Sequence, residues 1–398
     1  MAISLVAGFG STAMSLAAGV WILDLTGSSS LAGLAGLCVF APTLAGPWLG
    51  TLVDRLPRRP LLITVDLVLA AVLLTLFAVR SREEAWLIYA VMLAYGISYV
   101  LLDAGESALL PAALPANALG DVNGWRSSAQ EGMKLIAPLA GAALYAWRGG
   151  PAVALLSATT PILGAGLYAL VRLDNSARDP GHDGPRTGDG GFRVGLSVLW
   201  GNRAIRIPVL VAGISIAMSG FGTSAIYATL TDRLGLPATA MGILASAQGA
   251  GSIAGGLGVG RLLARFGPVR IGACGAALFA LGRVLQGLSG WPLLIAGTVL
   301  IGVGLPWTLI AGITAVQTNT PGALLGRVSA TSTTAMFGPN ALAIPLGAAA
   351  VQLGSRPPLF LTALVCAATA VFAVFGGRAT GRTRPSRAVA AEQANASG

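Results

Sequence analysis

Hydrophobic residues along the chain come in long runs, separated by short polar or glycine-rich stretches. A helix of about 20 apolar residues spans a bilayer, because it rises about 1.5 Å per residue. The pattern predicts twelve such helices and therefore an all-α integral membrane protein. The predicted spans are 2–25, 31–53, 61–79, 85–104, 122–147, 152–170, 207–230, 238–263, 271–288, 292–316, 328–352 and 359–375.

Polar segments divide this series of runs. Residues 174–191 are rich in Gly, Pro, Asp and Arg and indicate a linker. Residues 192–207 interleave apolar residues with arginines, a pattern typical of an interfacial helix. We therefore predict an N-terminal six-helix half at 1–172, a cytoplasmic linker with an interfacial helix at 173–205, a C-terminal six-helix half at 206–376 and a basic cytoplasmic tail at 377–398.

A cluster of charge separates the second and third predicted spans. The stretch that starts at Gly50 reads G-T-L-V-D-R-L-P-R-R-P and contains Asp54, Arg55, Arg58 and Arg59. Arginines beside membrane spans favour the cytoplasmic side, so the stretch predicts a cytoplasmic loop.

Three patterns of the first half recur in the second half at nearly one offset. The stretch at Gly50 returns in weaker form at Gly260, 210 positions later, with Ala264 in place of the carboxylate. Patterns at 115–122 and 138–139 return 206 and 207 positions later. Three matches in the same order predict two parallel halves around a central cavity.

The pattern G-x-L-x-D-R-x-x-R-R resembles the loop signature between helices 2 and 3 of the major facilitator superfamily, with Pro57 where the family usually has glycine. The resemblance implies a secondary transporter that works by alternating access. In the family the aspartate contacts the end of helix 11, and the arginine pairs with a carboxylate at the base of helix 4. The implied conformational latch, which favours the outward-facing state, comprises Gly50, Asp54, Arg55, Arg58, Arg59, Asp103 and Glu106. The alternative is a charge cluster that only sets topology.

Composition excludes a water-soluble domain. The chain has 398 residues, of which 55% are hydrophobic and 10% charged, against about 25% charged in soluble domains. Of 25 basic residues, 18 fall in or beside predicted cytoplasmic segments. This asymmetry predicts a multi-pass protein of the cytoplasmic membrane with both termini in the cytoplasm, and it explains the net charge of +10 without nucleic acid. The five basic residues predicted on the outer side are Arg80, Arg82, Arg148, Arg233 and Arg356.

Charges inside predicted spans are the strongest functional signal, because burying a charge in hydrocarbon costs at least ~2.5 kcal/mol. Glu131 and Lys134 lie roughly 13 and 18 Å into the fifth predicted helix and share one face. They are either a proton-coupling pair or a buried structural pair. Asp66 is either a structural ion-pair partner of Arg58, Arg59 or Arg126, or a further proton site. Asp24 is predicted at the outer edge, and Arg283 within a span.

Glycines and aromatic residues supply weaker signals. Gly124, Pro138 and Gly141 match a motif that the resemblance associates with antiporters, although alanine or methionine replaces three of its other glycines. The predicted contacts of a substrate cavity, each with core packing as the alternative, are Tyr95, Tyr99, Gln248, Trp307, Met336, Phe337 and Asn340.

The resemblance, together with Glu131, implies proton-coupled efflux of a hydrophobic or amphipathic small molecule. The alternative is uptake of a nutrient or metabolite by symport or facilitated diffusion. An enzyme is disfavoured because the chain has no HExxH, no G-x-S-x-G and no phosphate-binding G-x4-G-K-[ST]. A sensor or scaffold remains a third alternative. The scattered Cys38, Cys274 and Cys366 and the single His182 predict no metal site and no cofactor. The expected partners are the substrate, protons and the lipid bilayer, and the expected state is a monomer.

Overall fold

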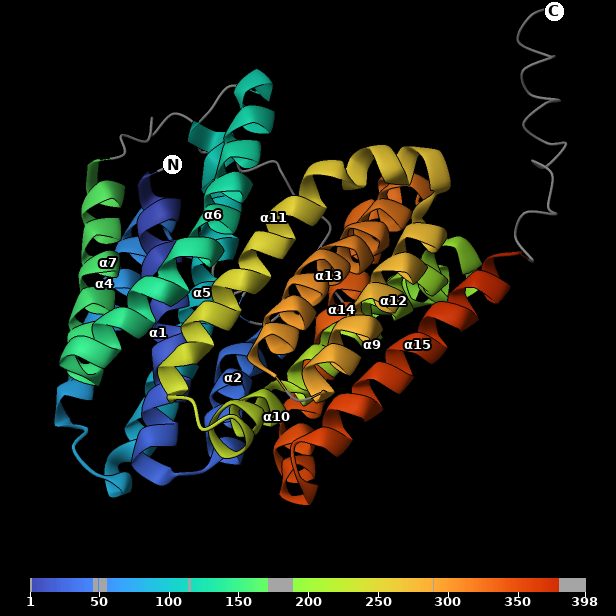
Figure 1. The fold of residues 1–398 in the computed structure, drawn as a ribbon. Coiled ribbons are helices and arrows are strands. Elements are labelled where there is room, and N and C mark those ends of the chain that lie inside the picture. Colours follow the sequence, from blue (N-terminus) through green and yellow to red (C-terminus); the bar gives the residue numbers. More distant parts are fainter. Residues whose placement is uncertain are drawn as a thin grey trace, which may run out of the picture.

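The computed structural model describes residues 2–45, 49, 56–113, 116–170, 189–288 and 290–378, and these are helical almost throughout (Figure 1). The first group of helices, which we call the N-terminal helices, pack on one another. They are α1 (Ala2–Thr26), α2 (Ser29–Leu44), α4 (Arg58–Leu74), η1 (Thr75–Ala78), η2 (Arg82–Glu84), α5 (Ala85–Ala113), α6 (Ala116–Arg148) and α7 (Gly150–Leu170).

The remaining helices pack on one another in the same way, and we call them the C-terminal helices. They are α8 (Asp189–Gly201), α9 (Arg203–Phe221), α10 (Thr223–Ala228), η4 (Thr229–Arg233), η5 (Ala238–Ala240), α11 (Met241–Phe266), α12 (Pro268–Gly287), α13 (Trp291–Asn319), α14 (Gly322–Ala350), η6 (Val351–Leu353) and α15 (Arg356–Arg378).

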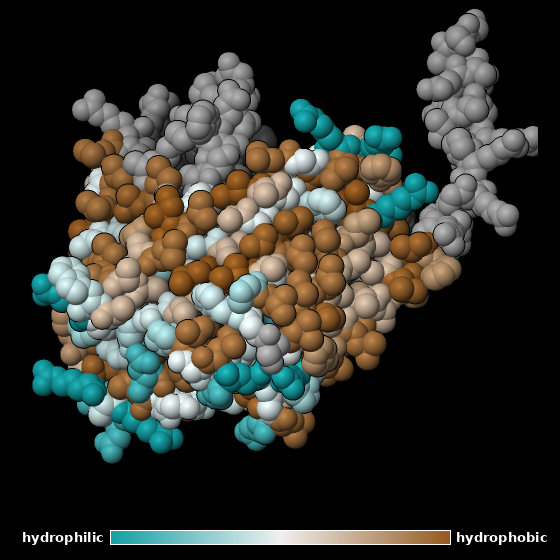
Figure 2. Space-filling model, viewed as in Figure 1, coloured by the Kyte–Doolittle hydropathy of each residue, from teal (hydrophilic) through white to brown (hydrophobic). Residues whose placement is uncertain are grey.

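The surface of this bundle is apolar around its middle. Among the described residues, nine helices are long and apolar enough to cross a membrane, and α2 is a shorter apolar helix of 16 residues. Large hydrophobic side chains such as Leu257 (83% exposed) and Leu170 (77% exposed) point outward. On the face in Figure 2, hydrophobic residues cover much of the molecule and the most hydrophilic ones gather toward its edges. Such a surface suits lipid.

The chain connections lie at two opposite ends of the bundle. At one end the chain turns at Gly27, Gly149 and Gly354, all of which have positive φ. We call this the Gly27 end, and it is the lower end in Figure 1. At the other end α11 passes into α12 at Gly267, whose φ of 78° also favours glycine. We call this the Gly267 end.

Helices of the Gly267 end run past the predicted apolar spans. The fourth predicted span was expected to end at residue 104, but α5 continues to Ala113. The eleventh was expected to begin at 328, but α14 begins at Gly322. Hydropathy identifies only the apolar part of a helix. The helix itself continues as long as its backbone hydrogen bonds continue, so a predicted span can be shorter than its helix.

The seventh predicted span is not one helix. It was expected over 207–230, but α9 ends at Phe221 and α10 begins at Thr223, with Gly222 between them. The guanidinium of Arg283 in α12 donates hydrogen bonds to the carbonyls of Ser219 (3.1 Å) and Met218 (3.5 Å). The Met218 carbonyl also accepts from the Gly222 N–H at 3.2 Å, and the Ser219 carbonyl from the Thr223 hydroxyl, so Arg283 adds a further donor at the break.

The predicted interfacial helix is also bounded differently. Residues 192–207 were expected to form one helix, but α8 ends at Gly201 and α9 begins at Arg203. Asn202 separates them and caps α9, since its side chain accepts a hydrogen bond from the Ala204 N–H at 3.0 Å. Leu199 of α8 is buried in a cluster with residues of α9 and α14.

Candidate functional site

The N-terminal and C-terminal helices meet most extensively along two pairs of helices, α2 with α14 and α6 with α11. In the first pair, the Ser30 hydroxyl donates a hydrogen bond to the Ala348 carbonyl at 2.7 Å. In the second pair, a Cβ added at Gly249 would lie 2.7 Å from the Lys134 carbonyl oxygen. Glycines thus let the helices approach to backbone contact, as small residues do in membrane bundles.

A closed cluster of side chains joins the two groups at the Gly27 end. Tyr227 of α10 is 5% exposed and packs with Val20, Leu23 and Ala32 of α1 and α2. A Cβ at Gly19 would collide with the Tyr227 hydroxyl, and one at Gly33 with the Ser224 hydroxyl. We call this cluster the Tyr227 plug. It fills the space between the two groups of helices with apolar and small side chains.

The residues of the predicted latch are mostly outside the described part. Gly50, Asp54 and Arg55 lie outside it, and so do the side chains of Arg58, Asp103 and Glu106, although the last two residues belong to α5. Arg59 is described. Its guanidinium donates hydrogen bonds to the carbonyls of Tyr168 (3.1 Å) and Ala169 at the end of α7. Arginine suits this place, since it supplies donors to carbonyls that a helix end leaves open.

The predicted coupling pair lies on α6, where that helix meets α11. Glu131 belongs to α6 and its side chain lies outside the described part, while the Lys134 side chain is exposed. The Lys134 backbone touches Gly249, and Gln248 is the residue beside it. The structure therefore brings the backbone of α6 at Lys134 to the junction between the two groups of helices.

Asp66 is buried inside the N-terminal helices, with 4% of its surface exposed. A Cβ at Gly164 of α7 would lie 2.6 Å from Asp66 Oδ2, so α4 and α7 pack closely there. Tyr95 of α5, which is 8% exposed, lies beside Thr160 and within electrostatic reach of Asp66. The structure thus joins Asp66 and Tyr95, two residues predicted separately, in one polar cluster, while Tyr99 is 60% exposed.

The other predicted cavity residues are distributed over the C-terminal helices. Trp307 donates a hydrogen bond from Nε1 to the Gly255 carbonyl at 2.9 Å and so joins α13 to α11. Met336 and Phe337 pack in one cluster against α9. Asn340 is 4% exposed, and its Oδ1 lies without a hydrogen-bond partner where a Cβ at Gly220 would collide with it.

Two residues of the antiporter-like motif make close helix contacts. A Cβ at Gly141 would lie 3.0 Å from the backbone of Ala13 in α1. The Pro138 carbonyl would lie 2.9 Å from a Cβ at Gly242 in α11. Gly124 belongs to α6, but its surroundings lie outside the described part.

Arg283 is the buried charge to which the sequence assigned no role. It is 4% exposed, and besides the carbonyls at the α9–α10 break it donates to Gln286 Oε1 at 2.9 Å and stacks 5.0 Å above the Phe279 ring. Gln286 in turn donates to the Thr298 hydroxyl at 2.8 Å. Neutral groups therefore solvate this cation. Its place within a predicted span was the only signal in the sequence.

The described part of the chain contains no group of three or more His, Cys, Asp or Glu residues that could hold a metal ion.

The family model of the Major Facilitator Superfamily matches residues 1–227 and 209–396. The chain belongs to the Major Facilitator Superfamily. It is therefore a membrane transporter of small molecules.

Relatives of known name match only part of the chain. Macrolide efflux protein A of Streptococcus pyogenes is 26% identical over 156 residues, which cover 38% of either protein. Macrolide efflux protein A of Enterococcus faecalis is 30% identical over 120 residues, which cover 30% of this chain and 36% of that protein. The matched segment thus spans well under half of these relatives.

Solved structures match over nearly the whole chain. The nucleoside transporter NupG superposes with a TM-score of 0.70 at 13% identity, and the match covers 96% of this chain and 98% of that one. A bacterial homologue of the lysosomal transporter Spinster, solved inward-facing and unoccupied, gives 0.70 at 15% identity and covers 97% and 98%. At this identity the likeness shows the fold alone.

Proposed function

We propose that this superfamily member exports a hydrophobic or amphipathic small molecule from the cell in exchange for protons. The observation that carries the proposal is the partial similarity to two macrolide efflux proteins, together with the Tyr227 plug that closes one end of the bundle. Exporters of apolar compounds load substrate from the cytoplasm or inner leaflet. A bundle that is closed at its outer end is in the conformation required for loading substrate from the cytoplasmic side.

The proposal includes an architecture of twelve spans in two halves. Six would come from α1, α2, α4, α5, α6 and α7, and six from α9–α10, α11, α12, α13, α14 and α15. The halves would rock about the α2–α14 and α6–α11 contacts. With the boundaries at 1–172 and 206–376, residues 173–205 link the halves in the cytoplasm, and 377–398 form a cytoplasmic tail.

The arginine distribution supports the orientation. Five basic residues, Arg80, Arg82, Arg148, Arg233 and Arg356, lie at the Gly27 end, against the 18 assigned to cytoplasmic segments, so we place this end outside the cytoplasmic membrane. The plug then closes the outer side, and the structure is an inward-facing state. The latch at Gly50, Asp54 and Arg55 would form when the halves close on the cytoplasmic side instead.

Proton coupling is proposed for the carboxylates within the N-terminal helices. Glu131 lies three residues before Lys134, and hence on the same helix face, close to the α6–α11 contact. A carboxylate beside Lys134 could bind and release its proton as the rearrangement of the halves changes how far it is desolvated. Asp66 is the second site, because it is buried beside Tyr95.

Flux measurements in proteoliposomes test both the coupling and its direction. Purified protein is given a proton gradient and erythromycin or a lipophilic cation as the probe. We expect substrate and protons to move in opposite directions, and Glu131→Gln to reduce substrate-driven proton flux to the level of protein-free liposomes. Glu83→Gln is the matched control, since it removes an exposed carboxylate between η1 and α5 and should leave the flux unchanged.

The other outcomes separate the alternatives. If substrate-driven proton flux survives in Glu131→Gln but is lost in Asp66→Asn, Asp66 is the coupling site. Movement of substrate and protons in the same direction favours uptake by symport. Substrate movement without proton movement contradicts antiport and favours facilitated diffusion.

A further inference from the structure

The short helices α10 and η4 follow the break in the seventh span, and we call them together the α10–η4 segment. The segment carries Ser224 and Tyr227 of the Tyr227 plug. A Cβ at Gly33 of α2 would collide with the Ser224 hydroxyl, and one at Gly19 of α1 with the Tyr227 hydroxyl. In Figure 1, α10 lies beside α2 at the lower end of the bundle. The position of this segment therefore decides whether the plug is closed.

Helix α12 contacts both ends of the α10–η4 segment. At its start, the Arg283 guanidinium lies against Gly222, where an added Cβ would be 2.7 Å from the guanidinium carbon. The same group donates to the Ser219 carbonyl at 3.1 Å. At its end, Arg233 donates to the carbonyl of Gly287, the last residue of α12, at 3.4 Å from each terminal nitrogen. The closer of the two attachments is thus the one that Arg283 makes.

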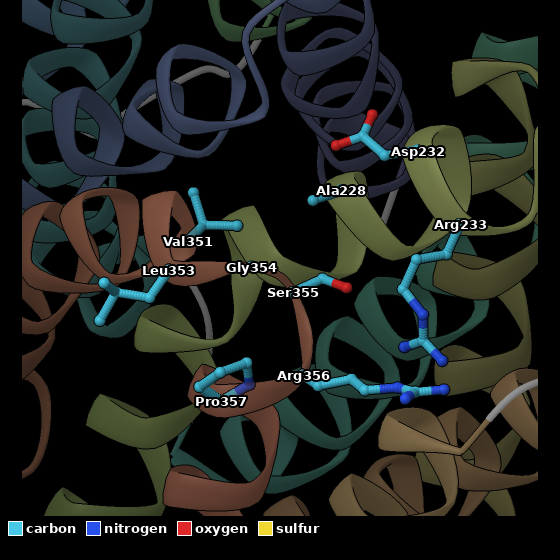
Figure 3. A pocket seen from close by; sticks show the side chains of 9 residues that line it. All are labelled: Ala228, Asp232, Arg233, Val351, Leu353, Gly354, Ser355, Arg356 and Pro357. Carbon is cyan, nitrogen blue, oxygen red and sulfur yellow. The ribbon is translucent and has the colours of Figure 1, made fainter.

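The side of the segment that faces α15 borders a pocket of about 450 Å³. This pocket lies between η4 and the turn from η6 into α15 (Figure 3). Ala228 and Asp232 line it from the segment, and Leu353 and Pro357 line it from the opposite side. Interdigitated side chains resist movement, whereas a pocket leaves room for it. The tilt of the segment therefore depends on the contacts at its ends.

The Arg283 guanidinium is itself held in place. It donates to Gln286 Oε1 at 2.9 Å and lies 5.0 Å from the centre of the Phe279 ring. Gln286 in turn donates to the hydroxyl of Thr298 in α13 at 2.8 Å. None of these four residues is more than 4% exposed. The end of an arginine side chain is normally flexible, but here the surrounding contacts fix it against Gly222.

An arginine inside a membrane span is unfavourable, and the local backbone does not require one here. Both carbonyls that Arg283 contacts already have partners at the break, namely the Gly222 N–H and the Thr223 hydroxyl. What arginine adds is geometry. Its planar guanidinium carries five N–H donors in fixed directions, so it reaches the end of α9 and Gln286 at the same time. It thus joins the break at Gly222 to α12.

The short helix α10 converts a small tilt at the break into a displacement at the plug. Tyr227 lies five residues beyond Gly222, or about 7.5 Å along the helix at 1.5 Å per residue. A tilt of ~10° at Gly222 therefore moves Tyr227 by about 1 Å. The Tyr227 hydroxyl occupies space that only a glycine at position 19 leaves open, so a displacement of this size changes the contact with α1.

We propose that Arg283 is a positioning residue of the Tyr227 plug. Its guanidinium fixes the tilt of the α10–η4 segment at Gly222, and this tilt places Ser224 and Tyr227 against α1 and α2. When the contact at Gly222 is lost, the segment tilts into the pocket beside α15 while the other C-terminal helices stay in place. That this opening is a step of transport rests on the alternating access of the proposed function.

Spin-label distances in the full-length protein in detergent distinguish a tilt of the segment from a movement of the two groups of helices. Labels at Asp232→Cys and Gln352→Cys both lie on the C-terminal helices and report the tilt by electron paramagnetic resonance. Labels at Glu83→Cys and Gln352→Cys report the separation of the two groups. All three positions are exposed. Cys366 is kept, because it is buried beside Arg283, and the other two cysteines are replaced.

Arg283→Gln should increase the population with a tilted segment about tenfold, because hydrogen bonds from a charged donor are lost. The distance between labels at positions 232 and 352 then shortens, since the segment enters the pocket. The matched control is Arg270→Gln, which removes an exposed arginine from the same helix and should leave both distances unchanged. Arg283→Lys keeps the charge and should restore part of the untilted population.

Three results overturn the proposal. The first is an unchanged distance between positions 232 and 352 in Arg283→Gln. The second is an equal change in Arg270→Gln. The third is a longer distance between positions 83 and 352 in Arg283→Gln without a tilt, because the two groups of helices would then move as whole units.

Gly222→Ala tests the same contact without removing a buried charge, and so guards against misfolding of Arg283→Gln. The added Cβ meets the guanidinium, and we expect the tilted population to rise about fivefold. In Arg283→Gln the same substitution should have no further effect, because its target is absent. No tilt in Gly222→Ala alone, or an equal effect in both backgrounds, contradicts the proposal. These measurements need neither substrate nor a proton gradient, so their outcome is independent of whether antiport is correct.

Discussion

The two junctions between the N-terminal and C-terminal helices are built differently. The α6–α11 junction is backbone against backbone, because a Cβ at Gly249 would meet the Lys134 carbonyl carbon and oxygen at 2.8 and 2.7 Å. The α2–α14 junction is packed less closely. A Cβ at Gly36 would lie 3.7 Å from Ile344 Cδ1, which is an ordinary van der Waals separation.

This difference assigns different roles to the junctions. Backbone atoms at the α6–α11 junction cannot rotate away, so its glycines set how closely the two groups approach. The α2–α14 junction consists of side-chain contacts and one hydrogen bond, from Ser30 to Ala348, and these can rearrange at low cost. The α6–α11 junction should therefore tolerate substitution least. Three substitutions test this ranking.

Gly249→Val should have the largest effect. The added carbons meet backbone of α6, and overpacking of this kind costs roughly 1–3 kcal/mol, or about 5- to 150-fold in the ratio of closed to open Gly27 end. Spin labels at Glu83→Cys and Gln352→Cys, one on each group of helices, report this opening as a longer distance by electron paramagnetic resonance. Gly256→Val is the matched control on the same helix, since a Cβ there meets nothing within 4 Å. Equal opening in the two variants would contradict the ranking.

Gly19→Ala in the Tyr227 plug should have an intermediate effect of about tenfold. Its Cβ collides with the Tyr227 hydroxyl, and Cζ lies 3.0 Å away. Tyr227→Phe removes the hydroxyl and should reverse most of the opening caused by Gly19→Ala. A double-mutant cycle on the same spin-label distances measures this coupling, which we expect at about 1 kcal/mol. Additive effects would mean that the two residues do not meet in the closed end.

Ser30→Ala should have the smallest effect. It removes one hydrogen bond across the α2–α14 junction, which corresponds to about 0.5–1 kcal/mol, or two- to fivefold in the same ratio. The control is Ser197→Ala, which removes a hydroxyl that bonds only within α8, to the Val194 carbonyl. If Ser30→Ala opened the Gly27 end more than Gly249→Val, the ranking of the junctions would be reversed.

Much of the fold could be predicted from apolar runs. The predicted spans 2–25 and 152–170 differ from α1 and α7 by at most two residues at either end, and a glycine with positive φ stands at one end of each helix, Gly27 after α1 and Gly149 before α7. The break at Gly222 was not predicted, because the stretch of Gly, Ser and Thr around it resembles the small-residue stretches found inside other spans. What identifies the break is Arg283, 61 positions later, whose guanidinium lies against carbonyls that only the folded chain brings near.

The candidate site was predictable in its residue types and less so in its arrangement. Asp66 and Tyr95 were selected separately, the first for its charge and the second for its aromatic ring, and only packing of α4, α5 and α7 brings them together. Trp307 was selected as a cavity residue, and the structure gives it a hydrogen bond between α13 and α11. Sequence spacing places residues on a helix face, but the neighbour of that face depends on tertiary packing.

The most direct test of alternating access is to lock the Gly27 end. In a variant whose three native cysteines are replaced, Ser30→Cys and Ala348→Cys are joined by a disulfide or a short thiol-reactive linker, and transport is measured in proteoliposomes. The two positions are in hydrogen-bond contact across the junction, so the link forms only in the closed state. We predict that the link abolishes transport, that its reduction restores transport, and that either single-cysteine variant transports normally. Transport that continues while the link remains intact would contradict opening of this end as a step of the cycle.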